Sequence, residues 1–175
     1  MKIIILLLLS LQLFGLEYNS LLLRAQASVF PKIILLDKNI DSKLSDGVIS
    51  LNIIHNEQWV EYAQKIKKLM DEKYKNSIGS YKFVVNLTNI ETTKKIKDAT
   101  AYYFFNLLED EKKKVLLDAK NKNKICFGYN DKDFDNGILI SLLLKEKTYI
   151  YLNKSSLHEY NIKFIPIFYK IIKVK

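Results

Sequence analysis

Cysteine, proline and glycine are scarce in this 175-residue chain, which contains 1 Cys, 2 Pro and 5 Gly. So little glycine and proline argues against a fibrous or linker-rich protein. The single cysteine, Cys126, can form no disulfide within the chain, so the fold has to rely on its hydrophobic core. Cys126 lies in the apolar stretch KICFGY, where we expect a small buried side chain and not a nucleophile.

Recognisable catalytic motifs are also missing. The glycines after residue 15 are isolated from one another, which excludes the glycine-rich loops that cradle phosphates. The G-x-S-x-G nucleophile motif is absent. The two histidines, His55 and His158, have no second His or Cys at metal-ligand spacing. We therefore predict no enzyme activity, no cofactor and no metal site.

Positive charge is in excess, with 28 Lys and Arg against 19 Asp and Glu and a formal net charge of +9. The lysines are dispersed over several predicted elements and mixed with acids, whereas a nucleic-acid binder concentrates charge on one face beside stacking aromatics. We therefore expect no nucleic-acid partner. The C-terminal stretch FIPIFYKIIKVK is predicted to be a helix docked by Ile167, Phe168 and Ile171, with solvated lysines. Peripheral contact of this stretch with anionic lipid is the alternative.

The N-terminal segment MKIIILLLLSLQLFG has one charged residue, Lys2, followed by an apolar run. This run is shorter than the about 20 apolar residues that a spanning helix needs, and it is typical of a secretory signal peptide. We predict that residues 1–15 are a signal peptide cleaved near Gly15, and that residues 16–175 form one domain in the periplasm. Retention of the segment as an anchor is the alternative.

The rest of the chain alternates between strand and helix patterns. Strands are predicted at 48–55, 81–87, 101–106, 124–129, 138–144 and 148–152. Helices are predicted from 19–20 up to Pro31, which should kink or end the first one, and then at 56–75, 109–122 and 153–159. Residues 88–100 fit either a short helix or an irregular crossover.

This order of elements predicts a single α/β domain. It has a mainly parallel sheet, helices on both faces and a C-terminal antiparallel edge hairpin. Because such sheets bind ligands outside the carboxyl ends of their strands, a small-ligand pocket is expected near Asn106, Tyr129 and Asn130.

The C-terminal third resembles the YfiR-like periplasmic family. The resemblance rests on the buried stretch KICFGY, the turn DKDFD, Gly137-Ile138 before a charged hairpin, and a strand that ends in Leu152-Asn153. The first helix running into Phe30-Pro31 fits as well. The resemblance implies the family's α/β fold. It also implies a secreted, non-catalytic regulator that binds an inner-membrane signalling protein, such as a diguanylate cyclase or a sensor kinase.

Two functions therefore remain open from the sequence. For a regulator, exposed residues of the hairpin or the first helix would contact the partner, with Tyr149, Ile150 and Tyr151 as the candidates. For a periplasmic module that binds a small anion, Asn106, Tyr129 and Asn130 would line the pocket. Converging lysines or hydroxyl groups in a pocket would favour the second function.

Overall fold

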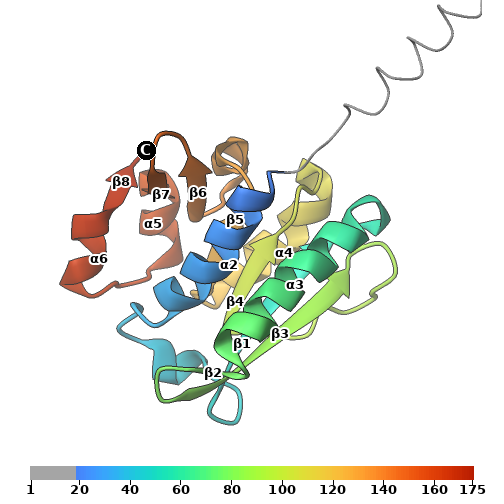
Figure 1. Ribbon diagram of the computed structural model, residues 1–175, viewed down its shortest axis with the longest axis horizontal. Coiled ribbons are helices and arrows are strands. Elements are labelled where there is room, and N and C mark those ends of the chain that lie inside the picture. Colours follow the sequence, from blue (N-terminus) through green and yellow to red (C-terminus); the bar gives the residue numbers. More distant parts are fainter. Residues whose placement is uncertain (1–18) are drawn as a thin grey trace, which may run out of the picture.

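The structure is a computed structural model and describes residues 19–175 (Figure 1). The predicted signal peptide, residues 1–15, lies outside the described residues. Eight strands form one sheet in the order β2-β3-β1-β4-β5-β6-β7-β8. The strands are β1 (Val48–His55), β2 (Ser77–Ile78), β3 (Tyr81–Asn89), β4 (Ala101–Phe104), β5 (Ile125–Gly128), β6 (Ile140–Leu144), β7 (Thr148–Leu152) and β8 (Ile172–Val174).

The predicted α/β architecture is confirmed. Strands β3, β1, β4, β5 and β6 run parallel to one another, whereas β2 is antiparallel to β3, and β6 and β7 form the antiparallel hairpin. Helices α2 (Ser20–Ile34) and α3 (Val60–Tyr74) lie in front of the sheet in Figure 1, and α4 (Glu109–Asn121) lies behind it. Two short helices, α5 (Lys154–Tyr160) and α6 (Pro166–Ile171), follow the hairpin. Both faces of the sheet are therefore covered.

The central strands are buried on both faces. Every residue of β4 and β5 is buried, and so are all but the first residue of β1. Cys126 lies in β5 with its side chain fully buried, and burial raises the pKa of its thiol to about 12. The expectation of a buried cysteine is confirmed.

The first helix does not end at Pro31. A kink or an end was predicted there, and the predicted end is wrong. The side chain of Asn19 caps α2 by accepting hydrogen bonds from the backbone of Leu21 and Leu22, and the helix continues to Ile34. Phe30, Ile33 and Ile34 are buried in the core. Burial of these large side chains outweighs the one backbone hydrogen bond that a proline removes.

The end of the chain differs from the predicted docked helix. Helix α6 has only 6 residues, because the chain then extends into β8, which pairs with β7 on its outer side. Phe168 is buried and its ring packs 4.1 Å from that of Phe164. The prediction that Ile167 and Ile171 also dock is wrong, since both are about half exposed at 50% and 51%.

Candidate ligand-binding pocket

The residues predicted to line a pocket follow the carboxyl ends of β4 and β5. The carbonyl of Tyr129 accepts a hydrogen bond from Gln26 Nε2 at 2.7 Å. The side chain of Asn130 accepts one from the backbone of Lys132 at 2.9 Å. Asn106 has a left-handed backbone with φ 48° at the end of its strand. A ligand-binding role for Asn106, Tyr129 and Asn130 stays a prediction.

Aromatic rings occupy the place where an α/β sheet most often binds its ligand. The order β3-β1-β4 puts the topological switch point at the carboxyl ends of β1 and β4. There the ring centroid of Phe105 lies 4.9 Å from that of Tyr129, 6.3 Å from that of Tyr62 and 6.4 Å from that of Trp59. This cluster makes that end of the sheet apolar.

The predicted partner-binding residues lie on β7, which is not the free edge of the sheet. Tyr149, Ile150 and Tyr151 are half-buried. Ile150 and Tyr151 are in register with Ile172 and Lys173 of β8. Strand β8 thus covers the backbone edge that the hairpin was expected to present, and the role of these three residues stays a prediction.

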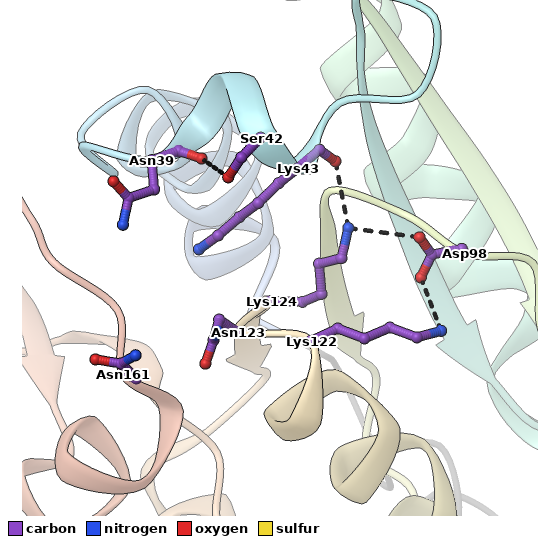
Figure 2. Close-up of a pocket in the computed structure, with 8 residues that line it drawn as sticks. All are labelled: Asn39, Ser42, Lys43, Asp98, Lys122, Asn123, Lys124 and Asn161. Atoms are coloured by element: carbon purple, nitrogen blue, oxygen red, sulfur yellow. Dashed lines mark hydrogen bonds and ion pairs between the residues drawn. The ribbon is translucent and has the colours of Figure 1, made fainter.

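A polar pocket of about 380 Å³ lies at the opposite end of the sheet (Figure 2). It is enclosed by the one-turn helix Ile40–Lys43, by the segments that lead into β4 and β5, and by the turn after α5. Its lining residues are Asn39, Ser42, Lys43, Asp98, Lys122, Asn123, Lys124 and Asn161. The pocket is thus at the amino ends of the strands and not at the carboxyl ends, where the sequence had suggested one.

Two of the pocket lysines are nearly buried and held in fixed positions. The Lys124 side chain is 8% exposed, and its Nζ donates a hydrogen bond of 3.3 Å to the backbone carbonyl of Lys43. The Lys43 ammonium forms a buried ion pair with Asp37. Because an ammonium group has three N–H donors, both lysines keep donor capacity beyond these contacts.

Asp98 and Lys122 form the more exposed side of the pocket. The Asp98 carboxylate lies 3.5 Å from Lys124 Nζ and 3.3 Å from Lys122 Nζ. Partial burial by itself would raise the pKa of the Asp98 carboxyl, but the charges of Lys124 and Lys122 outweigh it and hold that pKa below its usual value. Hydrogen bonds to Asp118 and Asp98 raise the pKa of Lys122. Asp98 and Lys122 are therefore both charged at neutral pH.

Two asparagines complete the floor of the pocket. Asn123 follows α4 with φ 54°, and Asn161 ends α5 with φ 44°. Both backbones are left-handed, a conformation that asparagine tolerates better than most residues at the end of a helix. Figure 2 shows both side chains below Asn39 in that view. Their amides add neutral donors and acceptors to the lysine ammonium groups.

The lining is suited to a small, polar and negatively charged ligand. The 8 lining residues include 3 lysines and 1 aspartate, which leaves a formal charge of 3 − 1 = +2 on the lining. Asp37 and Asp118 offset part of this charge from outside, so the attraction is moderate. The lining has no aromatic or aliphatic residue that could pack against an apolar ligand.

Sequence reasoning missed this pocket because its residues come from four separate segments. The run KNKNK at 120–124 was visible, but such lysines are usually solvated on the surface. Two asparagines close to the ends of predicted helices, one directly after 109–122 and one two residues after 153–159, were the one available signal, because asparagine favours the left-handed position there. Across residues 19–175, His, Cys, Asp and Glu side chains form no group of three that could hold a metal ion.

Comparisons with known proteins give the fold and little more. No family model matches the chain, and a search of curated proteins finds no match. A conserved domain protein from Vibrio cholerae O1 biovar El Tor superposes with a TM-score of 0.50 at 12% identity, over 78% of this chain and 57% of that one.

A second solved structure is similar at the same level. The ABC domain from Streptococcus pneumoniae in complex with L-Trp superposes with a TM-score of 0.51 at 10% identity, over 81% of this chain and 61% of that one. The chain therefore spans about three fifths of the length of each solved structure. These likenesses support the α/β fold.

Proposed function

We propose that this protein is a non-catalytic binding protein whose pocket in Figure 2 takes a small, polar anion such as a phosphate or a carboxylate. The observation that carries the proposal is the joint presence of Lys43, Lys122 and Lys124 with asparagine amides on one open pocket. The solved ABC domain with bound L-Trp supports it only as an example of a similar fold in a complex with a small molecule.

The expected affinity is modest. A hydrogen bond to a charged group contributes about 1.5–3 kcal/mol. Two such bonds from the pocket lysines, about 3–6 kcal/mol together, correspond to a dissociation constant between about 6 mM and about 40 μM. The carboxylate of Asp98 opposes a stronger attraction, because it already pairs with Lys122 and Lys124.

Thermal unfolding of the full chain in phosphate and in chloride, at equal ionic strength, tests the proposal. Phosphate should raise Tm above its value in chloride, because a ligand that binds only the folded state stabilises it. The double variant Asn123→Gly/Asn161→Gly should show a smaller difference, because it removes both amides while the lysines stay and glycine keeps the left-handed backbone. The matched control is Asn76→Gly, which has the same backbone conformation with φ 62° after α3, outside the pocket.

The phosphate experiment distinguishes binding in the pocket from a general effect of phosphate on Tm. A phosphate effect that is equal in the protein and in Asn76→Gly, but smaller in the double variant, supports the pocket. No phosphate effect in the protein, or an equal effect in all three, contradicts it.

A regulator that binds an inner-membrane signalling protein is the second candidate function. It rests on the resemblance to the YfiR-like family, which implies a partner contact on the first helix or the hairpin, and Leu21 on the first helix, at 68% exposed, is the residue to test. Affinity purification from the cell envelope should recover a signalling protein with the natural chain and not with Leu21→Glu. Leu117→Glu, in α4, is the control for an exposed leucine elsewhere. Equal recovery with Leu21→Glu would exclude this contact.

A further inference from the structure

Exposed apolar side chains gather at the C-terminal end of the chain. Four large hydrophobic residues within 167–174 are between 48% and 57% exposed. They are Ile167, Tyr169, Ile171 and Val174. Isolated exposed apolar residues are ordinary, but a group of them on two consecutive short elements indicates a contact surface.

The same segment carries only positive charge. Residues 160–175 contain 4 lysines and no Asp or Glu. Lys170 and Lys173 are exposed among the apolar residues. Lys173 Nζ also lies 3.8 Å from the ring centroid of Tyr149 on β7. The hairpin tip contains one acid, Glu146, which is flanked by Lys145 and Lys147. We call the exposed residues Ile167, Tyr169, Lys170, Ile171, Lys173 and Val174 the C-terminal face.

The fold holds this face in place at one end of the sheet (Figure 1). Phe168 is fully buried between the exposed neighbours of α6, and β8 is hydrogen-bonded to β7. The amide of Lys175 donates to the carbonyl of Leu152 at 3.0 Å. The apolar residues are thus displayed by an anchored segment.

The C-terminal face is not expected to bind a partner by pairing another strand with β8. The strand has only 3 residues and carries a lysine, and short edge strands with lysine resist pairing with a further strand. A partner surface that contacts both aliphatic side chains and lysines, without pairing through a strand of its own, fits the observations better. The hydrocarbon boundary and anionic headgroups of a bilayer provide this combination.

We propose that the C-terminal face binds the surface of a bilayer that contains anionic phospholipid. Ile167 and Ile171, one helical turn apart on α6, enter the headgroup boundary, and Lys170 and Lys173 contact anionic headgroups. This contact is peripheral and reversible, since neither the short apolar surface nor the lysines alone give stable attachment. It is independent of the anion pocket, which is lined by other residues.

Co-sedimentation of the full chain with vesicles tests this proposal. One set of vesicles is pure phosphatidylcholine, and the other contains phosphatidylglycerol as well. Residues 1–18 include an apolar run that is the same in every variant, so the measured quantity is the increase in binding when phosphatidylglycerol is added. Each lysine near an anionic surface contributes about five-fold to binding, so Lys170→Glu/Lys173→Glu should reduce this increase by at least about twenty-fold.

The apolar part is tested by Ile167→Glu/Ile171→Glu, which should abolish the increase as well. The matched controls are Lys68→Glu in α3, where the side chain is 77% exposed, and Leu117→Glu in α4, at 59%. Both should bind as the unchanged protein does. Far-UV circular dichroism should show that all four variants are folded. If the isoleucine variant is unfolded, the lysine variant alone decides, because its side chains are exposed.

Three results would overturn the proposal. One is equal binding of the protein to both kinds of vesicle. Another is an increase that Lys170→Glu/Lys173→Glu leaves unchanged. The third is an increase lost equally in Lys68→Glu, which would show general charge attraction and no defined face.

Discussion

The ammonium group of Lys124 donates a hydrogen bond to the backbone carbonyl of Lys43, which lies 81 positions earlier in the chain. This bond joins the one-turn helix after α2 to the start of β5 across the polar pocket (Figure 2). The side chain of Lys124 therefore contributes to the wall of the pocket and to its rigidity. Its ion pair with Asp98 at 3.5 Å connects a third segment to the same group.

Replacement of Lys124 should weaken both stability and anion binding. Lys124→Met leaves the buried carbonyl of Lys43 without this donor, and a buried polar group without a partner costs about 1–3 kcal/mol. Urea denaturation should show that loss in the free energy of unfolding. The control is Lys122→Met, which removes a charge from a side chain that is 45% exposed and should change stability by less than about 1 kcal/mol. Equal losses in both variants would contradict this role of Lys124.

Acid should lower the free energy of unfolding through protonation of Asp98. Its pKa is lower in the folded protein than the usual 3.8, so the folded state binds fewer protons at this site than the unfolded state does. The resulting stabilisation is fully present above that value and is lost as the pH falls through the lower, folded pKa. In Asp98→Asn, stability should therefore fall less steeply below about pH 4. Denaturation curves between pH 2.5 and 6, with ~0.5-unit steps, would measure this. An unchanged acid dependence would contradict the assignment.

The buried ion pair between Lys112 of α4 and Asp133 should respond strongly to loss of one partner. Lys112→Met leaves the Asp133 carboxylate buried without its counter-charge, which costs about 3–5 kcal/mol. The double variant Lys112→Met/Asp133→Asn should recover much of that loss, because no buried charge remains and asparagine keeps an acceptor for the backbone of Asn130. The free energy of unfolding of both variants in urea provides the test. A double variant as unstable as the single one would show that charge is not the cause.

Gly128 should not accept a side chain. A Cβ atom at this position would lie 2.9 Å from Asp133 Oδ2 and 3.0 Å from Ile138 Cγ2, so Gly128→Ala should destabilise the protein by about 1–3 kcal/mol. Gly47→Ala is a useful comparison, because nothing lies within 4 Å of a Cβ there and only the left-handed φ of 72° opposes it. That change should cost about 1 kcal/mol. If Gly128→Ala were no worse than Gly47→Ala in thermal unfolding, close packing at β5 would not be the reason for this glycine.

Much of the fold could be predicted from the sequence because local patterns determine it. Strand β1 alternates polar and apolar residues before a helix whose apolar side chains recur at three and four positions, and Ala63, Ile66 and Met70 are indeed buried. Strand β8 could not be predicted, because the apolar pattern of PIFYKIIKV suits a helix as well as a strand. Its pairing with β7 decides between them, and that pairing is a tertiary contact.

The candidate site was harder to predict for a physical reason. The rule for α/β sheets pointed to the carboxyl ends of β4 and β5, but Trp59, Tyr62, Phe105 and Tyr129 place aromatic rings there. A lysine in a sequence gives no sign of whether it will be buried. Lys124 is nearly buried and Lys122 is half exposed, although only one residue separates them.

The measurement that tests the central claim most directly is a two-dimensional ¹H–¹⁵N NMR titration of the full chain with phosphate, with chloride added at equal ionic strength as the reference. Binding in the pocket predicts that the side-chain amide signals of Asn123 and Asn161, and the backbone amide signal of Lys43, shift together and saturate with a dissociation constant between about 6 mM and about 40 μM. The amide of Asn76 should not shift. Shifts without saturation, or shifts that leave Asn123 and Asn161 unaffected, would contradict an anion site in this pocket.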